Sequence, residues 1–300
     1  MFPEYDLEQQ AAVMRAVAAH SAVPVPRVRW VEPSSDVLGQ PFVVRTGSRV
    51  WSRSTIPLRV RWLAARGHVG AVRGPATRFG GGVGGYPLDS RSGVAVAGAR
   101  RRRRRRRPAQ ARRQRAHLLR VDAPRGRGAD SALEEGFDWL EEHWPSAPSE
   151  PVLCWGDSRI GNIMYRDFAP VAVLDWELAT LAPREVDVGW FVFFHRMFQD
   201  MAEQFDRPGL PHLLRREEVV ALYEETTGVE LRDLDFYLVY AAVRHGIIMS
   251  RIKRRSIHFG DSAAPSDPNG YVLHHHLLRR MIDGEPAFPI TQSRNGRRIE

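Results

Sequence analysis

One long segment, residues 45–127, most constrains how this 300-residue chain can fold, because its sequence has no pattern that forms a hydrophobic core. Residues 45–127 contain 23 arginines, no lysine and two acids, and so carry a formal charge of +21, whereas the rest of the chain sums to −12. This stretch has no sustained apolar period of 2 or 3.6, which a strand or an amphipathic helix needs in order to bury one face. We therefore expect the hydrophobic core to be built from residues 1–44 and 128–300.

Composition excludes several other classes of protein. The chain contains no run of 18 apolar residues, the length needed to span a membrane, and the N-terminus lacks the apolar core of a signal peptide. The single cysteine, Cys154, cannot form an internal disulfide, which is typical of a reducing compartment. We expect a cytoplasmic protein without a membrane partner.

The two flanks of the arginine-rich stretch have the patterns of ordinary globular sequence. Residues 6–20 carry apolar side chains at helical spacing after Asp6, a residue type that caps helices. Proline and glycine punctuation separates the other predicted elements. These are strands at 28–31, 41–44, 152–154, 163–165 and 171–174, and helices at 130–144, 186–205, 216–226, 231–254 and 271–282.

Polar side chains cluster around the hairpin predicted at residues 163–174. Because a hairpin brings its two ends together, we expect Asn162 and Asp175 to lie side by side, with Asp157 brought near by the preceding loop. Carboxylate and amide oxygens suit Mg²⁺. If Asn162 and Asp175 hold the metal, Asp157 is free to accept a proton from an attacking hydroxyl, as phosphoryl transfer requires.

The motifs WGDSRIGN, VLDWE and PREVDVGW, between residues 155 and 190, resemble the catalytic core of the aminoglycoside phosphotransferase family. The resemblance covers residues 130–285 and, less closely, residues 1–44. It implies an α+β, protein-kinase-like two-lobe fold with a mainly helical C-terminal lobe, and transfer of the γ-phosphate of ATP to a small-molecule hydroxyl. It also makes Asp157 the catalytic base, Asn162 and Asp175 the Mg²⁺ ligands, and Asp187 the acid that supports the catalytic loop.

The chain departs from the family pattern in three places. Trp155 stands where the loop histidine usually is, and Gln10, with Glu8 nearby, falls where the helix glutamate is expected. Lys253 is the only lysine in the chain, so no lysine precedes it to hold the ATP phosphates, and no glycine-rich phosphate loop is recognisable. The resemblance therefore implies a truncated N-terminal lobe.

We expect three parts in the chain: residues 1–44, a remnant of the nucleotide-binding lobe; residues 45–127, an irregular segment; and residues 128–300, the catalytic and substrate lobe. Our hypothesis is that residues 45–127 are disordered or translated out of the family's reading frame, and that Met1 is an internal start. Family-like sequence on both flanks and the preference for arginine over lysine motivate this hypothesis.

Three alternatives stay open on the sequence alone. The polar residues of the motif could cap backbone groups of a turn-rich loop. The missing lysine favours an inactive, degraded or pseudokinase-like product. The run Arg100–Arg107 could bind nucleic acid nonspecifically through phosphate contacts, although no aromatic residues are interleaved with it.

Overall fold

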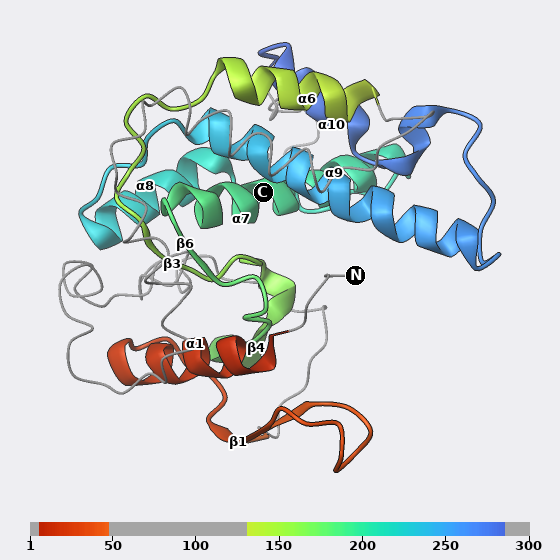
Figure 1. Ribbon diagram of the computed structural model, residues 1–300. Helices are drawn as coiled ribbons and strands as arrows, with labels where there is room; N and C mark the ends of the chain where they lie inside the picture. Colours follow the sequence, from red (N-terminus) through yellow and green to blue (C-terminus); the bar gives the residue numbers. More distant parts are fainter. Residues whose placement is uncertain (1–5, 48–130, 286–300) are drawn as a thin grey trace.

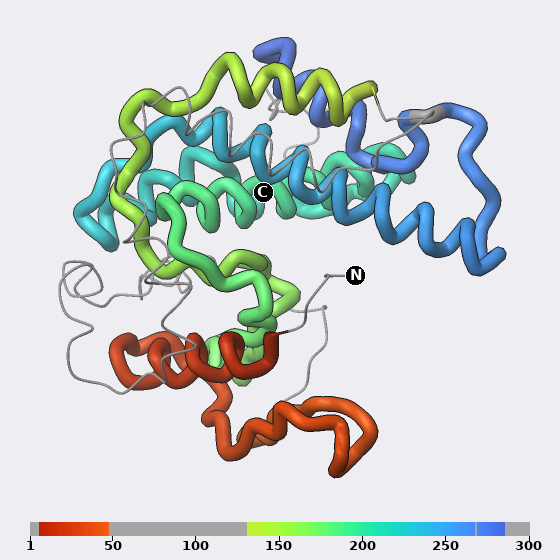
Figure 2. The backbone as a smooth tube through the Cα atoms, viewed as in Figure 1, coloured from red at the N-terminus to blue at the C-terminus, as the bar shows by residue number. Residues whose placement is uncertain are grey.

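A computed structural model of the protein describes residues 6–47 and 131–285. The arginine-rich segment lies outside the described residues apart from positions 45–47, and so does the run Arg100–Arg107. The expected division of the chain at residues 44 and 128 therefore stays a prediction. Figures 1 and 2 show the described N-terminal part on one side, a group of helices on the other, and short strands between them.

The N-terminal part consists of one helix and one hairpin. Helix α1 (Leu7–His20) begins after Asp6, whose carboxylate accepts the backbone N–H of Gln9 at 2.8 Å, as the sequence predicted. Strands β1 (Val28–Glu32) and β2 (Phe42–Arg45) pair antiparallel. Ala11, Met14 and Val17 are buried on one face of α1, which confirms the predicted helical spacing.

Two further antiparallel pairs follow the helix α6 (Ser131–Glu142). Strands β4 (Ile163–Arg166) and β5 (Ala169–Val173) form the predicted hairpin. Strand β3 (Val152–Cys154) pairs with β6 (Thr180–Ala182), which the sequence analysis missed. Because β6 is only three residues long, it is too short to display a period of its own. Ile163 of β4 and Val173 of β5 belong to the same core cluster as Met14 and Val17 of α1.

Four helices complete the described chain: α7 (Glu185–Gln204), α8 (Arg216–Thr227), α9 (Leu234–His258) and α10 (His275–Ile282). The predicted starts of the last two were too early. Asp233 takes a left-handed conformation, with φ of 51°, so α9 begins at Leu234. A separate 3-10 turn, η2 (Pro268–Tyr271), precedes α10. None of the helices in the described ranges is long and apolar enough to cross a membrane.

Helix α7 is the centre of the helical part and is buried on most of its faces. It packs closely against α9 because Gly189 has no side chain at the crossing. A Cβ built on Gly189 would lie 2.9 Å from the backbone oxygen of Tyr237 on α9. Side chains of both helices belong to one core cluster, which also contains Phe137 of α6 and Met14 of α1. The core therefore joins the two flanks of the arginine-rich segment.

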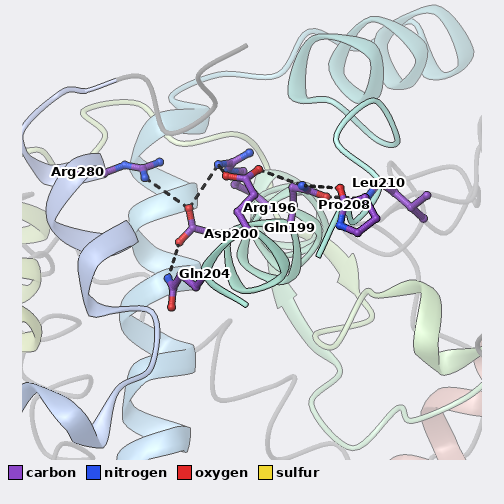
Figure 3. A network of polar contacts seen from close by, with 8 residues as sticks. Arg196, Gln199, Asp200, Gln204, Pro208, Leu210 and Arg280 are labelled. Atoms are coloured by element: carbon purple, nitrogen blue, oxygen red, sulfur yellow. Dashed lines mark hydrogen bonds and ion pairs between the residues drawn. The ribbon is translucent and has the colours of Figure 1, made fainter. Parts of the chain in front are cut away.

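A buried polar network holds the C-terminal half of α7 in place (Figure 3). The carboxylate of Asp200 lies 3.4 Å from both Arg196, on the same helix, and Arg280 of α10. The preceding residue, Gln199, accepts the backbone N–H of Leu210 at 2.6 Å. Because buried charges are tolerated only when they are paired, these contacts fix α10 and the loop after α7 against the helix.

Candidate active site

The hairpin places Asn162 and Asp175 at the same end, as its sequence predicted. Ile163 is the register partner of Val173, and the next residue, Leu174, donates its backbone N–H to the carbonyl of Asn162 at 2.9 Å. The two side chains thus flank the open end of the hairpin. Val173 also donates to the carbonyl of Pro24 at 2.7 Å, so the N-terminal part is bonded to the strand that leads to Asp175.

Asp157 lies in the loop between β3 and β4, where three side chains donate to its carboxylate. Its Oδ2 accepts Nδ2 of Asn162 at 2.6 Å and Nε of Arg159 at 3.1 Å. Its Oδ1 accepts the indole Nε1 of Trp190, on α7, at 2.8 Å. The side chain is 13% exposed, so the carboxylate is oriented by its donors and still reaches solvent.

Asp187, in the first turn of α7, holds the backbone just before Asp157. Its carboxylate accepts the backbone N–H groups of Trp155, at 2.6 Å, and Gly156, at 2.8 Å. Ser158 donates its hydroxyl to the carbonyl of Asp187 at 2.6 Å. Asp187 is fully buried, and this burial raises its pKa to about 6 against the opposing effect of the two backbone donors. The loop and the helix are therefore joined on both sides of Gly156.

The loop makes a turn that only glycine tolerates. Gly156 has φ of 88°, and a Cβ on it would lie 2.1 Å from the carbonyl oxygen of Leu178. Its own carbonyl accepts Nη1 of Arg244, on α9, at 3.1 Å. The segment after Asp175 and the helix α9 thus approach the loop from two directions.

Trp155, at the position where the sequence resemblance implies a histidine, connects the loop to the hairpin. Its indole Nε1 donates to the carbonyls of Leu174, at 2.8 Å, and Asp175, at 3.0 Å. Its backbone N–H binds Asp187. This one buried residue therefore links the chain segments that carry Asp157, Asp175 and Asp187.

Asp175 is placed where a cation would relieve an electrostatic conflict. It is half-buried with a left-handed φ of 62°, and its pKa is raised by burial and then by the negative charge of Asp157, against the opposing charges of Arg159 and Arg45. Because Nδ2 of Asn162 is bonded to Asp157, Oδ1 of the same amide is the atom left for a metal. The donor set fits Mg²⁺.

The donor set is small. In the part of the chain that the structure describes, no three His, Cys, Asp or Glu side chains are placed to hold a metal ion together. A cation bound by Asn162 and Asp175 would complete its coordination with water and substrate phosphates, as Mg²⁺ does in phosphoryl-transfer sites.

Three residues of the site were missed by the sequence analysis: Arg159, Trp190 and Arg244. Trp190 follows Asp187 by three residues in the same motif, so its position on the same helical face was the available signal. Arg244 had no local signal, because it comes from a helix about 90 residues further along. Lys253 lies nine residues beyond Arg244, about 14 Å along α9.

The profile of the phosphotransferase enzyme family matches residues 3–219 of this chain. The chain belongs to the phosphotransferase enzyme family. This finding confirms the membership that the motifs at residues 155–190 indicated.

Solved structures share the fold of this family member at low identity. The crystal structure of a Ralstonia eutropha protein that is assigned as an aminoglycoside phosphotransferase superposes on this chain with a TM-score of 0.58 at 22% identity. The match covers 92% of this chain and 82% of the other. A thermostable mutant of aminoglycoside phosphotransferase APH(4)-Ia, in a ternary complex with ADP and hygromycin B, gives a TM-score of 0.52 at 15% identity, with coverages of 92% and 82%. The expected α+β, kinase-like fold with a helical C-terminal lobe is confirmed.

Curated relatives of this phosphotransferase-family chain include much longer proteins. Acyl-CoA dehydrogenase family member 11 of Pongo abelii is 27% identical over 117 residues, which is 36% of this chain and 15% of the relative. Acyl-CoA dehydrogenase family member 10 of Mus musculus is 28% identical over 151 residues, 46% of this chain and 14% of the relative. The match thus spans about one seventh of these relatives.

Proposed function

We propose that this protein transfers the γ-phosphoryl group of ATP to a hydroxyl of a small molecule. The observation that carries the proposal is the arrangement around Asp157: a solvent-reaching carboxylate, oriented by Asn162, Arg159 and Trp190, beside a second carboxylate at Asp175. Membership of the phosphotransferase enzyme family supports the reaction class.

In the proposed reaction, each acid has a separate task. Asp157 accepts the proton of the acceptor hydroxyl as its oxygen bonds to the γ-phosphorus and the bond to the β-phosphate oxygen breaks. Asn162 and Asp175 would hold Mg²⁺, which when bound neutralises charge on the phosphates. Asp187 keeps Trp155 and Gly156 in place, so that the loop holding Asp157 is preorganised.

The acceptor is proposed only as a class, a small molecule with a hydroxyl group. One structural neighbour was solved with hygromycin B, and the curated relatives carry names of acyl-CoA dehydrogenase family members. We therefore propose that a first acceptor panel contain an aminoglycoside, simple sugars and a hydroxylated acyl-CoA.

ATP turnover with Mg²⁺ over this panel tests the proposal on the full chain. We expect one acceptor to stimulate ADP formation, and Asp157→Asn to lower that stimulated rate by about 10²-fold or more, because the amide cannot take the proton. Asp235→Asn makes the same chemical change at a 73% exposed acid of α9 and is the matched control. Equal rates for wild type and Asp157→Asn would overturn the catalytic proposal.

A second candidate function is that of an inactive family member. Two observations favour it: Lys253 on α9 is the only lysine of the chain, and the half-buried position on α1 expected to carry a glutamate holds Gln10. Titration calorimetry with Mg-ATP distinguishes the two candidates. Absence of binding heat at millimolar nucleotide would support the inactive form, and a saturable binding heat would contradict it.

A further inference from the structure

The carboxylate of Asp157 has unequal numbers of donors on its two oxygens. Oδ2 accepts from both Asn162 and Arg159, whereas Oδ1 accepts only from Trp190 among the described residues. A carboxylate oxygen has two lone-pair positions. Both positions of Oδ2 are therefore used, and one position of Oδ1 has no donor from residues 6–47 and 131–285.

The indole of Trp190 is itself held on several sides. The guanidinium of Arg244 lies over its ring at 4.6 Å, and the ring of Phe194 packs at 4.8 Å. The ring of His245 approaches edge-on at 6.2 Å. Trp190 is 2% exposed, so its N–H has one fixed direction and does not follow the carboxylate if that side chain rotates.

The same arginine connects Trp190 to the backbone of the loop. Arg244 stacks on the indole and also donates to the carbonyl of Gly156, next to Asp157. The indole N–H and the loop backbone are therefore positioned against each other by one side chain from α9. This arrangement sets the rotation of the Asp157 carboxylate independently of any bound ligand.

We propose that Trp190 is a positioning residue that selects Oδ1 of Asp157 as the atom that accepts the proton. The inference rests on the proposed function. The acceptor hydroxyl gives its proton to the free lone pair of Oδ1, its oxygen bonds to the γ-phosphorus, and ADP leaves with the electrons of the broken P–O bond. Without the indole N–H, the carboxylate is held only through Oδ2 by Asn162 and Arg159, so it turns more widely about its Cβ–Cγ bond and the lone pair of Oδ1 is aligned for a smaller part of the time.

Trp190→Phe tests the proposal because it keeps an aromatic ring and removes the N–H. We expect kcat to fall about 10- to 100-fold, the effect of losing one hydrogen bond to a charged group, while the KM for ATP changes less than about twofold. Trp139→Phe is the control, since it makes the same change at a half-buried indole of α6 that stacks on His143 at 4.1 Å, outside the loop, the hairpin and α7. The control should keep the wild-type kcat.

NMR spectroscopy of the full chain labelled with ¹⁵N-tryptophan examines the hydrogen bond between Trp190 and Asp157 without requiring turnover. The indole N–H resonance of Trp190 is assigned by its absence in Trp190→Phe. We expect Asp157→Ala to shift this resonance and to speed its exchange with solvent, while the resonance of Trp139 stays in place.

The outcomes separate the two proposals. An unchanged Trp190 resonance in Asp157→Ala, or a wild-type kcat in Trp190→Phe, would overturn the positioning role even if the enzyme is active. A shifted resonance in a protein that turns over no acceptor would support the contact and contradict the proposed function.

Discussion

Gly156 donates its backbone N–H to Oδ1 of Asp187 across 2.8 Å, and this bond joins the loop before Asp157 to the first turn of α7. The neighbouring N–H of Trp155 binds Oδ2 of the same carboxylate. The position of the candidate base therefore depends on a buried acid that lies 31 residues beyond Gly156 in the sequence. Because that acid is buried, the geometry of the loop is coupled to the protonation of Asp187 and to the packing around it.

The first prediction concerns pH and Asp187. Burial raises the pKa of this carboxyl from 3.8 to about 6, so the unfolded state binds fewer protons than the folded state between these pH values. The contribution of Asp187 to the free energy of unfolding therefore decreases as pH rises from about 4 to about 6, by on the order of 3 kcal/mol, and is constant above that range. Urea unfolding of wild type and Asp187→Asn from pH 4 to 7 measures it.

The informative quantity is the pH dependence of the difference in unfolding free energy between wild type and Asp187→Asn. The variant loses the titrating carboxyl group of residue 187 and also one of the two oxygens that accept the backbone N–H groups of Trp155 and Gly156. Asp235→Asn, at an exposed acid, is the control and should leave the pH dependence of wild type intact. If Asp187→Asn has the same pH slope as wild type, the raised pKa is wrong.

The second prediction concerns the glycine of the loop. Gly156→Ala combines a strained φ of 88° with a clash of the new Cβ against the Leu178 carbonyl. We therefore expect this variant to lower the free energy of unfolding by more than about 3 kcal/mol. Gly228→Ala, at φ of 68° with nothing within 4 Å, has the strain without the clash and should lose only about 1 kcal/mol. Equal losses in the two variants would show that Leu178 does not confine the loop.

The third prediction compares two glycines in helices. A methyl group at Gly189 meets the backbone of Tyr237 at 2.9 Å, whereas one at Gly246 meets the end of the Leu133 side chain at 2.6 Å. Because a side-chain end moves more easily than a helix backbone, we expect Gly189→Ala to destabilise by about 2 kcal/mol more than Gly246→Ala. Thermal unfolding of both variants checks this order, and the reverse order would contradict the α7–α9 packing.

The fourth prediction concerns the candidate metal ligand Asn162. Replacing it by alanine removes an oxygen donor and also the N–H that orients Asp157. We expect Asn162→Ala to raise the Mg²⁺ concentration needed for half-maximal ATP turnover by about 10-fold or more. Asn269→Ala, at an amide that binds Ser131 and Arg279 far from the loop, is the control. An unchanged Mg²⁺ dependence for Asn162→Ala would remove it from the metal site.

Local patterns were sufficient for the elements with a strong period or a cap. Helix α1 begins after Asp6 as predicted, and the β4–β5 hairpin carries Asn162 and Asp175 to one end, because turn residues and apolar alternation act within a few residues. Strand β6 and the start of α10 were mispredicted. The first depends on pairing with β3, some 28 residues away, and the second on a separate turn at Pro268.

The sequence by itself determined the family motif, the identity of the four acids and amides in it, and the hairpin that pairs two of them. Only the tertiary structure decided how Asp157 is oriented. Its donors come from its own loop and from α7, and Arg244 of α9 supports both. Local spacing cannot encode such contacts, because they join the loop to residues 33 and 88 positions further along the chain, which only the packing of α7 and α9 brings to it.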